Sequence, residues 1–148
     1  MIRPVVLHPD PVLRGVCDPV TGDCVVLARD MLDTMYAAPG RGLAAPQVGV
    51  ALRLIVMDTG WKEGLPDPRV FVNPQVVARE GRQVNTEGCL SIPDTPRRIA
   101  RPARVTVAFD APEGRRRETF DGFAAACLCH EIDHLDGVLI LDLPEAAE

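Results

Sequence analysis

The chain has 148 residues, a formal net charge of −5, 47% hydrophobic residues and 25% charged residues. This length and balance predict a single globular domain over residues 1–148, and the acidic charge argues against DNA binding. No apolar run reaches the roughly 18 residues that a membrane span needs, and the first residues do not resemble a signal peptide. Five cysteines without regular spacing favour free thiols in a reducing, cytoplasmic compartment.

The N-terminal part of the chain predicts one helix between two irregular stretches. Residues 4–20 carry several prolines, which indicate an extended entry and a tight turn at Pro9–Arg14. A helix is expected from Asp23, which can cap it, to about Ala38, where a Pro-Gly pair follows. The residues expected to form its core stripe are Val25, Ala28, Leu32 and Met35, and Asp30 and Asp33 lie off that stripe.

Short strands are predicted along most of the remaining chain. Gly40–Gln47 is rich in small residues and predicts a tight loop that another backbone can approach closely. Branched and aromatic residues predict strands at Leu52–Met57, Val70–Val77, Gln83–Thr86, Arg104–Phe109, Arg115–Phe120 and Val138–Leu141. Together with a second helix, these strands predict an α+β fold in which antiparallel β-sheets pack around that helix.

The second helix carries two of the three histidines of the chain. It is predicted between Asp121, a suitable N-cap, and Gly137, which suits a left-handed C-terminal cap. Residues four apart share a helix face, so His130 and His134 could bind one metal ion. Glu131 completes the pattern H-E-x-x-H, in which the carboxylate takes a proton from water that the metal activates. Because this pattern also arises by chance in buried helices, a third ligand must be found.

The position of the third ligand is not given by this pattern. In the longer version of the motif, H-E-x-x-H-x-x-G-x-x-H, the glycine is matched by Gly137, but the last ligand position is Ile140. Only residues 135–148 follow the pattern, and they include Pro144, so a ligand on a further helix is hard to accommodate. We therefore expect the third ligand upstream.

Three stretches of the chain resemble the signature motifs of the peptide deformylase family. They are Gly40–Gln47 (GRGLAAPQ), Glu87–Ser91 (EGCLS) and His130–His134 (HEIDH). Pro9–Arg14 and Phe71–Pro74 are also similar to that family, so the resemblance covers nearly the whole chain. It implies the deformylase fold and a hydrolase of the bacterial cytoplasm. Such an enzyme removes the N-formyl group from the N-terminal formylmethionine of nascent polypeptides and releases formate.

The resemblance also implies a metal site and a set of catalytic residues. It makes Cys89 the third ligand beside His130 and His134, and such a set leaves one position of a tetrahedral site open for water. One divalent ion is implied, Fe²⁺ in the native enzyme, although Zn²⁺, Ni²⁺ or Co²⁺ could occupy the same ligands. The implied catalytic residues are Glu131 as the base, and Gln47 and the Leu90 backbone N–H as donors to the oxyanion.

Four residues are expected to contact the substrate. Gly42 would pair with the extended peptide as an added strand, while Arg41, Phe123 and Ala126 would line the pocket of the first side chain. Arg41 stands where the family usually has an aliphatic residue, and Ala126 is small, so the preference for formylmethionine is open. The expected partners are formylated nascent peptides, and the protein is expected to be a monomer. The tail Pro144–Glu148 is brief, whereas many members have a C-terminal helix that contacts the ribosome, so ribosome docking is not implied.

Other functions are compatible with parts of the same pattern. A deformylase-like paralogue could act on another formyl or acyl amide, a non-catalytic protein could use the metal structurally, and a simple peptidase is a third alternative. The presence of Glu131 and Gln47 weighs against a purely structural role.

Several cysteines and arginines have no expected function. Cys127 and Cys129 diverge by about 200° on a helix and are predicted to be packing residues, with Cys127 near the substrate pocket. Cys17 and Cys24 are unassigned. The arginines expected mainly on solvated faces are Arg97, Arg98, Arg101, Arg104 and Arg115–Arg117.

Overall fold

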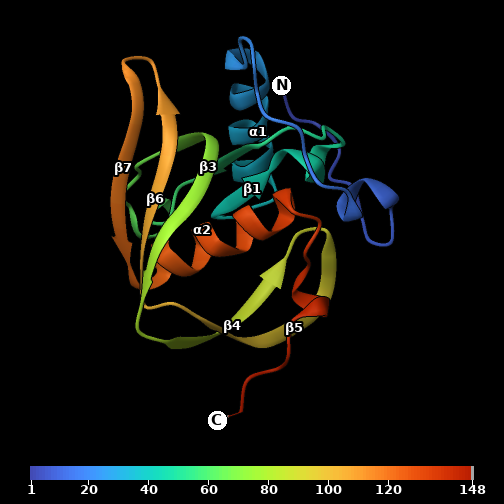
Figure 1. Cartoon of the computed structure of the whole chain (residues 1–148). Helices are drawn as coiled ribbons and strands as arrows, with labels where there is room; N and C mark the ends of the chain where they lie inside the picture. The colour runs from blue at the N-terminus through green and yellow to red at the C-terminus, as the bar shows by residue number, and fades with distance from the viewer. Residues whose placement is uncertain (148) are drawn as a thin grey trace.

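The computed structural model describes residues 1–147, and its centre is a helix held between two antiparallel sheets (Figure 1). The larger sheet has the strand order β1-β2-β3-β6-β7, and the smaller sheet pairs β4 with β5. The strands of the larger sheet are β1 (Gly42–Ala44), β2 (Leu54–Met57), β3 (Arg69–Glu80), β6 (Arg104–Ala111) and β7 (Gly114–Asp121). The other elements are β4 (Gln83–Cys89), β5 (Ile92–Arg101), α1 (Val25–Ala37) and α2 (Gly122–Leu135). The α+β architecture expected from the sequence is confirmed. Among the described residues, no helix is long and apolar enough to cross a membrane.

Helix α2 is buried on almost all sides, although it carries His130, Glu131, Asp133 and His134. It contacts strands of both sheets, and in Figure 1 it crosses between the larger sheet and the β4–β5 pair. Beneath it, the ring of Phe71 packs edge to face against Phe109 and Phe120, with centroids 5.0 and 5.7 Å apart. Leu128 and Leu135 of α2 are buried in the same cluster. Since each buried side chain of this size contributes roughly 1.5–3 kcal/mol, this core fixes the rotation of α2.

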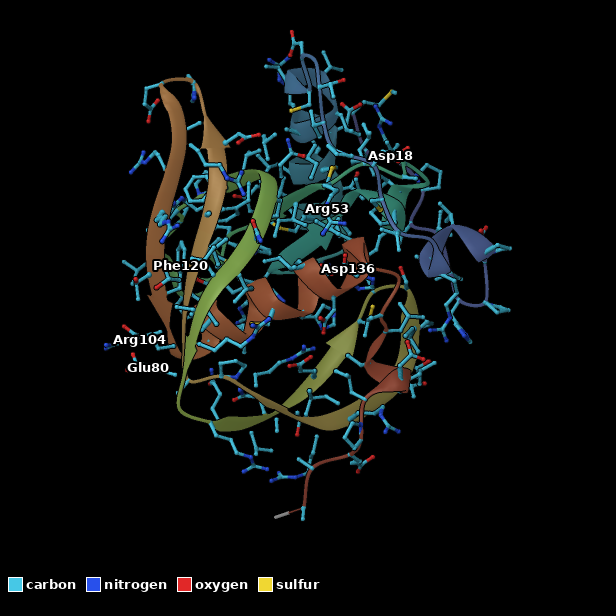
Figure 2. The ribbon with its side chains drawn as sticks, in the orientation of Figure 1. Asp18, Arg53, Glu80, Arg104, Phe120 and Asp136 are labelled. Carbon is cyan, nitrogen blue, oxygen red and sulfur yellow. The ribbon has the colours of Figure 1, made fainter. Side chains whose placement is uncertain are left out.

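Ion pairs fasten both ends of α2 (Figure 2). Asp121 stands at the N-cap position, but its carboxylate makes no cap bond and instead accepts from Arg104 Nε at 2.6 Å, so the predicted capping role is wrong. At the other end, Arg53 donates to the Leu135 carbonyl and to Asp136 Oδ1, both at 3.0 Å. A cation at a helix C-terminus is favoured by the helix dipole. The helix is thus anchored to β6 through Arg104 at one end and to the residue before β2, Arg53, at the other.

Helix α1 lies within the predicted range, but its buried face is rotated from the predicted stripe. Ala28 and Met35 are buried as expected, whereas Val25 is 59% exposed and Asp30 only 5% exposed. Arg3 donates from Nε to Asp30 Oδ2 at 3.0 Å. Because a carboxylate can be buried when it is paired, this ion pair overrides the hydrophobic stripe.

The predicted strand at Val138–Leu141 is wrong. Ile140–Asp142 forms a 3₁₀ turn, and the Asp142 carboxylate accepts from the Leu139 backbone N–H at 2.8 Å. Leu139 and Ile140 are buried against Leu13 beside the β4–β5 sheet. Val138–Leu141 therefore packs as a loop, because the Asp142 carboxylate accepts from the Leu139 N–H, which in a strand would bond to a neighbouring strand. Glu148, the end of the predicted acidic tail, lies outside the described residues.

Two further segments differ from the sequence-based expectation. Gly40–Gln47 contains strand β1 and a 3₁₀ turn at Ala45–Val48 rather than only a loop. Strand β5 was not predicted, because Pro93 and Pro96 argue against a strand. Both prolines are exposed in this two-stranded sheet. The β6–β7 hairpin and strand β2 occur where the pattern predicts them.

Gly137, just after α2, offers a test of how tightly the helix end is packed. Its φ is +73°, and a Cβ added there would overlap the carbonyl oxygen of Arg14. We expect Gly137→Ala to lower the free energy of unfolding by about 1–3 kcal/mol, since both left-handed backbone and close approach exclude a side chain. Gly22→Ala is the control, because a Cβ there meets nothing within 4 Å. Urea unfolding measures both, and equal midpoints for the two variants would contradict the packing described.

Candidate active site

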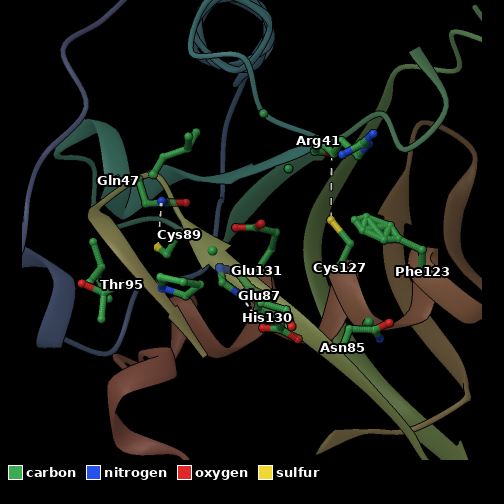
Figure 3. Close-up of a pocket in the computed structure, with 18 of the residues that line it drawn as sticks. Arg41, Gln47, Asn85, Glu87, Cys89, Thr95, Phe123, Cys127, His130 and Glu131 are labelled. Atoms are coloured by element: carbon green, nitrogen blue, oxygen red, sulfur yellow. Dashed lines mark hydrogen bonds and ion pairs between the residues drawn. The ribbon is translucent and has the colours of Figure 1, made fainter. Parts of the chain in front are cut away.

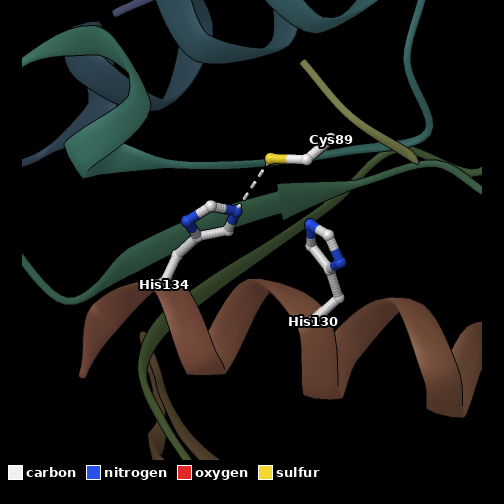
Figure 4. A group of neighbouring side chains, drawn as sticks. All are labelled: Cys89, His130 and His134. Atoms are coloured by element: carbon white, nitrogen blue, oxygen red, sulfur yellow. Dashed lines mark hydrogen bonds between the residues drawn. The ribbon is translucent and has the colours of Figure 1, made fainter. Parts of the chain in front are cut away.

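Segments far apart in the sequence bring one thiol and two imidazoles together. Cys89 ends β4, and His130 and His134 lie one turn apart on α2. The atoms that these three side chains could offer to a metal all lie within 4.8 Å of one another. Cys89 Sγ is 3.4 Å from His134 Nε2 (Figure 4). The three residues expected to bind a metal are therefore neighbours in space.

The chemistry of this cluster fits a divalent transition metal. All three side chains are buried. Burial and the nearby charge of His130 lower the pKa of His134 to about 3, so its ring is neutral and offers a lone pair. One sulfur and two nitrogen donors suit iron or zinc, and three protein ligands leave a fourth position for a reactant.

The surroundings of His130 favour positive charge. Burial alone would lower the pKa of its ring, but the Glu131 carboxylate and hydrogen bonds with Cys89 and Glu87 outweigh burial and raise the pKa to about 10. Metal ligation requires the neutral ring, so a bound cation would take the place of this proton. The same acidic surroundings that hold a proton here would thus attract a divalent ion.

A buried ion network holds the orientation of His130. Its Nδ1 lies 2.9 Å from Glu87 Oε1, which leaves Nε2 to face Cys89 and His134. Arg101 of β5 donates to both oxygens of Glu87, at 2.8 and 2.9 Å, and also to Asp133 of α2 at 2.6 Å. Arg101 is buried, so the prediction that it lies on a solvated face is wrong. The bidentate contact of Arg101 fixes the Glu87 carboxylate, and this carboxylate in turn fixes the His130 imidazole.

Glu131 is a buried carboxyl group with an unusual pKa. It is 5% exposed, and its Oε1 has no hydrogen-bond partner among residues 1–147. Burial raises the pKa of this carboxyl to about 7. Strand β1 passes very close to it, because a Cβ built on Gly42 would lie 2.6 Å from Glu131 Oε2 and 2.8 Å from Cys127 Sγ. A carboxyl group in this state can accept and return a proton near neutral pH.

Gln47 is held beside the same cluster by its neighbours. Its Oε1 accepts from the Ala44 backbone N–H at 3.0 Å, which directs Nε2 toward the other side. Nε2 lies 3.1 Å from Ser91 Oγ and 3.7 Å from Cys89 Sγ. Leu90 stands between these two residues in the chain and also lines the cleft. The amide donor is therefore fixed within reach of the cluster.

These groups line one cleft with a volume of about 750 Å³ (Figure 3). All residues predicted for the site line this cleft, except His134. They are Arg41, Gly42, Gln47, Cys89, Leu90, Phe123, Ala126, His130 and Glu131. In Figure 3, Gln47 and Cys89 lie at one side, Glu131 and Cys127 in the middle, and Arg41 and Phe123 at the other side. Cys127 lies on the cleft wall as expected, and Cys129 is buried in the core.

Sequence reasoning gave no role to three residues of the ion network: Glu87, Arg101 and Asp133. Glu87 belongs to the EGCLS motif and Asp133 to the HEIDH motif, so both lie within stretches whose pattern indicates the site. The sequence does not indicate that Arg101 pairs with Glu87 and Asp133. In the β4–β5 register Arg101 lies opposite Gln83, and only the tertiary fold brings its side chain to Glu87, four residues further along β4.

A buried Cys/His/His cluster with a carboxyl group and an amide donor around it defines the site of a metal-dependent hydrolase. Comparison with known proteins agrees. The family model described as "Polypeptide deformylase" matches residues 2–147. The peptide deformylase of Rhizobium meliloti (strain 1021) is 50% identical over 146 residues, which cover 95% of this chain and 84% of the relative. The chain belongs to the polypeptide deformylase family.

Solved structures agree with this assignment. A peptide deformylase from Thermotoga maritima superposes with a TM-score of 0.90 at 37% identity, covering 99% of each chain. One from Legionella pneumophila gives a TM-score of 0.91 at 41% identity, covering 98% of this chain and 87% of the other. The fold and the family expected from the three motifs are confirmed.

The ion network predicts an effect of Arg101 on metal affinity. We expect Arg101→Met to weaken binding of Co²⁺ or Zn²⁺ by about 10–100-fold, because Glu87 loses the partner that orients it against His130. Competition with a chromophoric chelator measures the affinity. The control is Arg116→Met on β7, which removes an exposed arginine paired with Glu113.

Circular dichroism identifies folded protein in each preparation. Should Arg101→Met fail to fold, Glu87→Gln tests the same contact with little change in volume. Unchanged metal affinity in a folded variant of either residue would show that the network does not position the ligand.

Proposed function

We propose that this protein removes the N-formyl group from the N-terminal formylmethionine of nascent polypeptides and releases formate. The observation that carries the proposal is that Glu131 and Gln47 line one cleft together with Cys89 and His130 of the candidate metal cluster. A base, an amide donor and a candidate metal site around one space are the groups that hydrolysis of an amide requires.

Cys89, His130 and His134 would hold one divalent ion, and we propose Fe²⁺ as the native one, with Zn²⁺, Ni²⁺ or Co²⁺ able to replace it. When bound, the ion would polarise the formyl carbonyl and make water a better nucleophile. The thiolate of Cys89 would offset part of the positive charge.

The side chains around the cluster would manage the proton and the developing charge. Glu131 would take a proton from the attacking water and pass it to the departing amine, for which a pKa near 7 is suited. The Gln47 Nε2 amide and the Leu90 backbone N–H would donate to the oxyanion. Loss of one such donor typically lowers the rate by about 10²–10³-fold.

Strand β1 offers an edge for the peptide. It is the outermost strand of the larger sheet and, among residues 1–147, pairs only with β2. An extended substrate could pair with its free edge at Gly42, and such main-chain pairing is largely indifferent to side chains. This suits an enzyme that meets the start of many different chains, and we propose the bacterial cytoplasm as its location and a monomer as its form.

Glu131→Ala tests the proposed base. We expect this variant to retain its metal, since none of the three ligands changes, and to lose at least about 10²–10⁴-fold in kcat/KM for formyl-Met-Ala. Formate release from protein purified anaerobically with Fe²⁺ measures the activity, and elemental analysis measures the metal. Substantial turnover by metal-loaded Glu131→Ala would remove Glu131 from its role, and a metal-loaded wild-type protein inert on formyl-Met-Ala would overturn the proposed function.

Gly42→Ala tests the close approach of β1 to the base. The added methyl group would meet Glu131 Oε2 at 2.6 Å and Cys127 Sγ at 2.8 Å, so the carboxylate must move. A displacement of this size is expected to lower kcat/KM by about 10²-fold with little change in thermal stability. Gly22→Ala is the control, because its Cβ would meet nothing within 4 Å and Gly22 does not line this cleft. Equal activities of the two variants would refute the tight contact.

A further inference from the structure

Arg41 places a positive charge in the wall of the cleft. Its backbone is fixed, because the Arg41 carbonyl accepts from the Asp58 N–H at 2.9 Å. The next residue, Gly42, is the one that lies against Glu131 and Cys127. Arg41 therefore precedes the closest point between β1 and the proposed base, and its side chain extends along the cleft from there (Figure 3).

The guanidinium of Arg41 is held only loosely. Its Cζ lies 5.6 Å from the centroid of the Phe123 ring, and its Nη2 lies 2.8 Å from Glu63 Oε1. The Glu63 side chain is 57% exposed. An ion pair with a carboxylate in water is weak, and a guanidinium has five N–H donors. Among residues 1–147, Glu63 is the only ionic partner of Arg41, so donors remain for a ligand in the cleft.

Arg41 lies against Phe123 in the first turn of α2, one end of the helix that carries the proposed metal ligands His130 and His134. Phe123 lies seven residues before His130, which at 1.5 Å per residue separates their Cα atoms by about 10 Å along the helix axis. By ordinary bond lengths, the carboxyl carbon of a formylated glutamate lies about 6 Å from the formyl carbon when extended. An acidic first side chain can therefore extend from the proposed metal site toward the Arg41 side of the cleft.

The other walls of this region leave room for such a side chain. Ala126 is small, and the ring of Phe123 is 49% exposed, so both can contact methylene groups. Methionine could pack against the same surfaces, but its thioether is only a weak acceptor and would leave guanidinium donors unsatisfied.

The charges around the cleft are compatible with an anionic side chain near Arg41. Lys62 lines the cleft too, with its Nζ 3.1 Å from the Pro39 carbonyl oxygen and 5.7 Å from the centroid of the Trp61 ring. Of the acidic groups that line it, Glu87 is paired with Arg101. Glu131 lies beside the reacting bond, and Asp94 belongs to β5.

We infer that Arg41 is a specificity-determining residue that lets this cleft accept N-formyl amides whose first side chain ends in a carboxylate or an amide. Glutamate is the preferred member of this class and glutamine the next. The inference rests on the proposed deformylase function and adds a substrate class to it. It assigns Arg41 to substrate selection and not to the chemical step.

The test is the ratio of kcat/KM for formyl-Glu-Ala to that for formyl-Met-Ala. We expect Arg41→Met to lower this ratio at least tenfold relative to the wild type, with formyl-Gln-Ala affected less. Arg41→Lys should keep part of the preference, because it keeps the charge but loses the planar donors. Glu63→Gln should raise the ratio, because it removes the carboxylate that competes for Arg41. Arg116→Met, which changes the net charge equally on the exposed β7, should leave the ratio unchanged.

Two outcomes separate this inference from the proposed function. A ratio that changes less than threefold in both Arg41→Met and Glu63→Gln would overturn the inference while formyl-Met-Ala hydrolysis still supports the function. A wild-type protein inert on every formyl peptide would overturn the function. The inference is then decided by equilibrium binding of the same peptides to Glu131→Gln protein, with and without Arg41→Met. An Arg41-dependent preference for formyl-Glu-Ala supports it, and equal affinities overturn it.

Discussion

The enclosure of α2 between two sheets is the constraint on which the rest of the structure depends. A helix buried on nearly all sides must bring its polar side chains into the interior, and α2 brings His130, Glu131 and His134. Unpaired charge in such a place costs several kcal/mol. The surrounding strands must therefore supply partners, and the smaller sheet does so with Cys89 and Glu87. The burial of α2 therefore has two effects: it forms the core, and it gathers the residues of the candidate metal site.

The ion network explains how the smaller sheet is placed. Strands β4 and β5 form no ladder with the larger sheet among the described residues, so backbone hydrogen bonds do not position them there. Arg101 instead reaches from β5 to Asp133 on α2 and to Glu87 on β4. Buried arginine–carboxylate pairs add little net stability, because the cost of desolvating both charges offsets much of their attraction. A small sheet anchored in this way can carry Cys89, a proposed metal ligand, at the end of β4 and still leave a cleft open beside β1.

The sequence predicted those parts of the fold whose signal is local. Alternation along β6 and β7 and helix signals along α2 required no knowledge of distant residues. Asp30 was placed outside the core of α1 because its partner, Arg3, is far away in the chain. Strand β5 was not predicted, because Pro93 and Pro96 argue against a strand. A two-stranded sheet tolerates them where they are exposed. Each error arose where a tertiary contact outweighed local preference.

The site was predictable to a similar extent and for a similar reason. Histidines four residues apart and the three motifs placed the cluster, because ligand spacing on a helix is a local property. The resemblance indicated that Arg41 enters the cleft. Its contacts with Phe123 and Glu63 join three separate segments, and no pattern within one segment indicates them.

Two buried carboxyl groups near His130 have pKa values that shift in opposite directions. Burial opposes ionisation of Glu87, but hydrogen bonds from Arg101 and His130 outweigh it and lower the pKa of this carboxyl to about 2. Glu131 is buried as well, yet its Oε1 has no partner among residues 1–147, and its pKa rises to about 7. One carboxylate thus stays ionised and can hold a histidine in place, while the other can exchange a proton. When one site pushes the pKa values of two carboxyl groups apart, it separates a structural role from a chemical one. Here that separation depends on Arg101 and His130, which both hydrogen-bond to Glu87, whereas Glu131 Oε1 has no partner among residues 1–147.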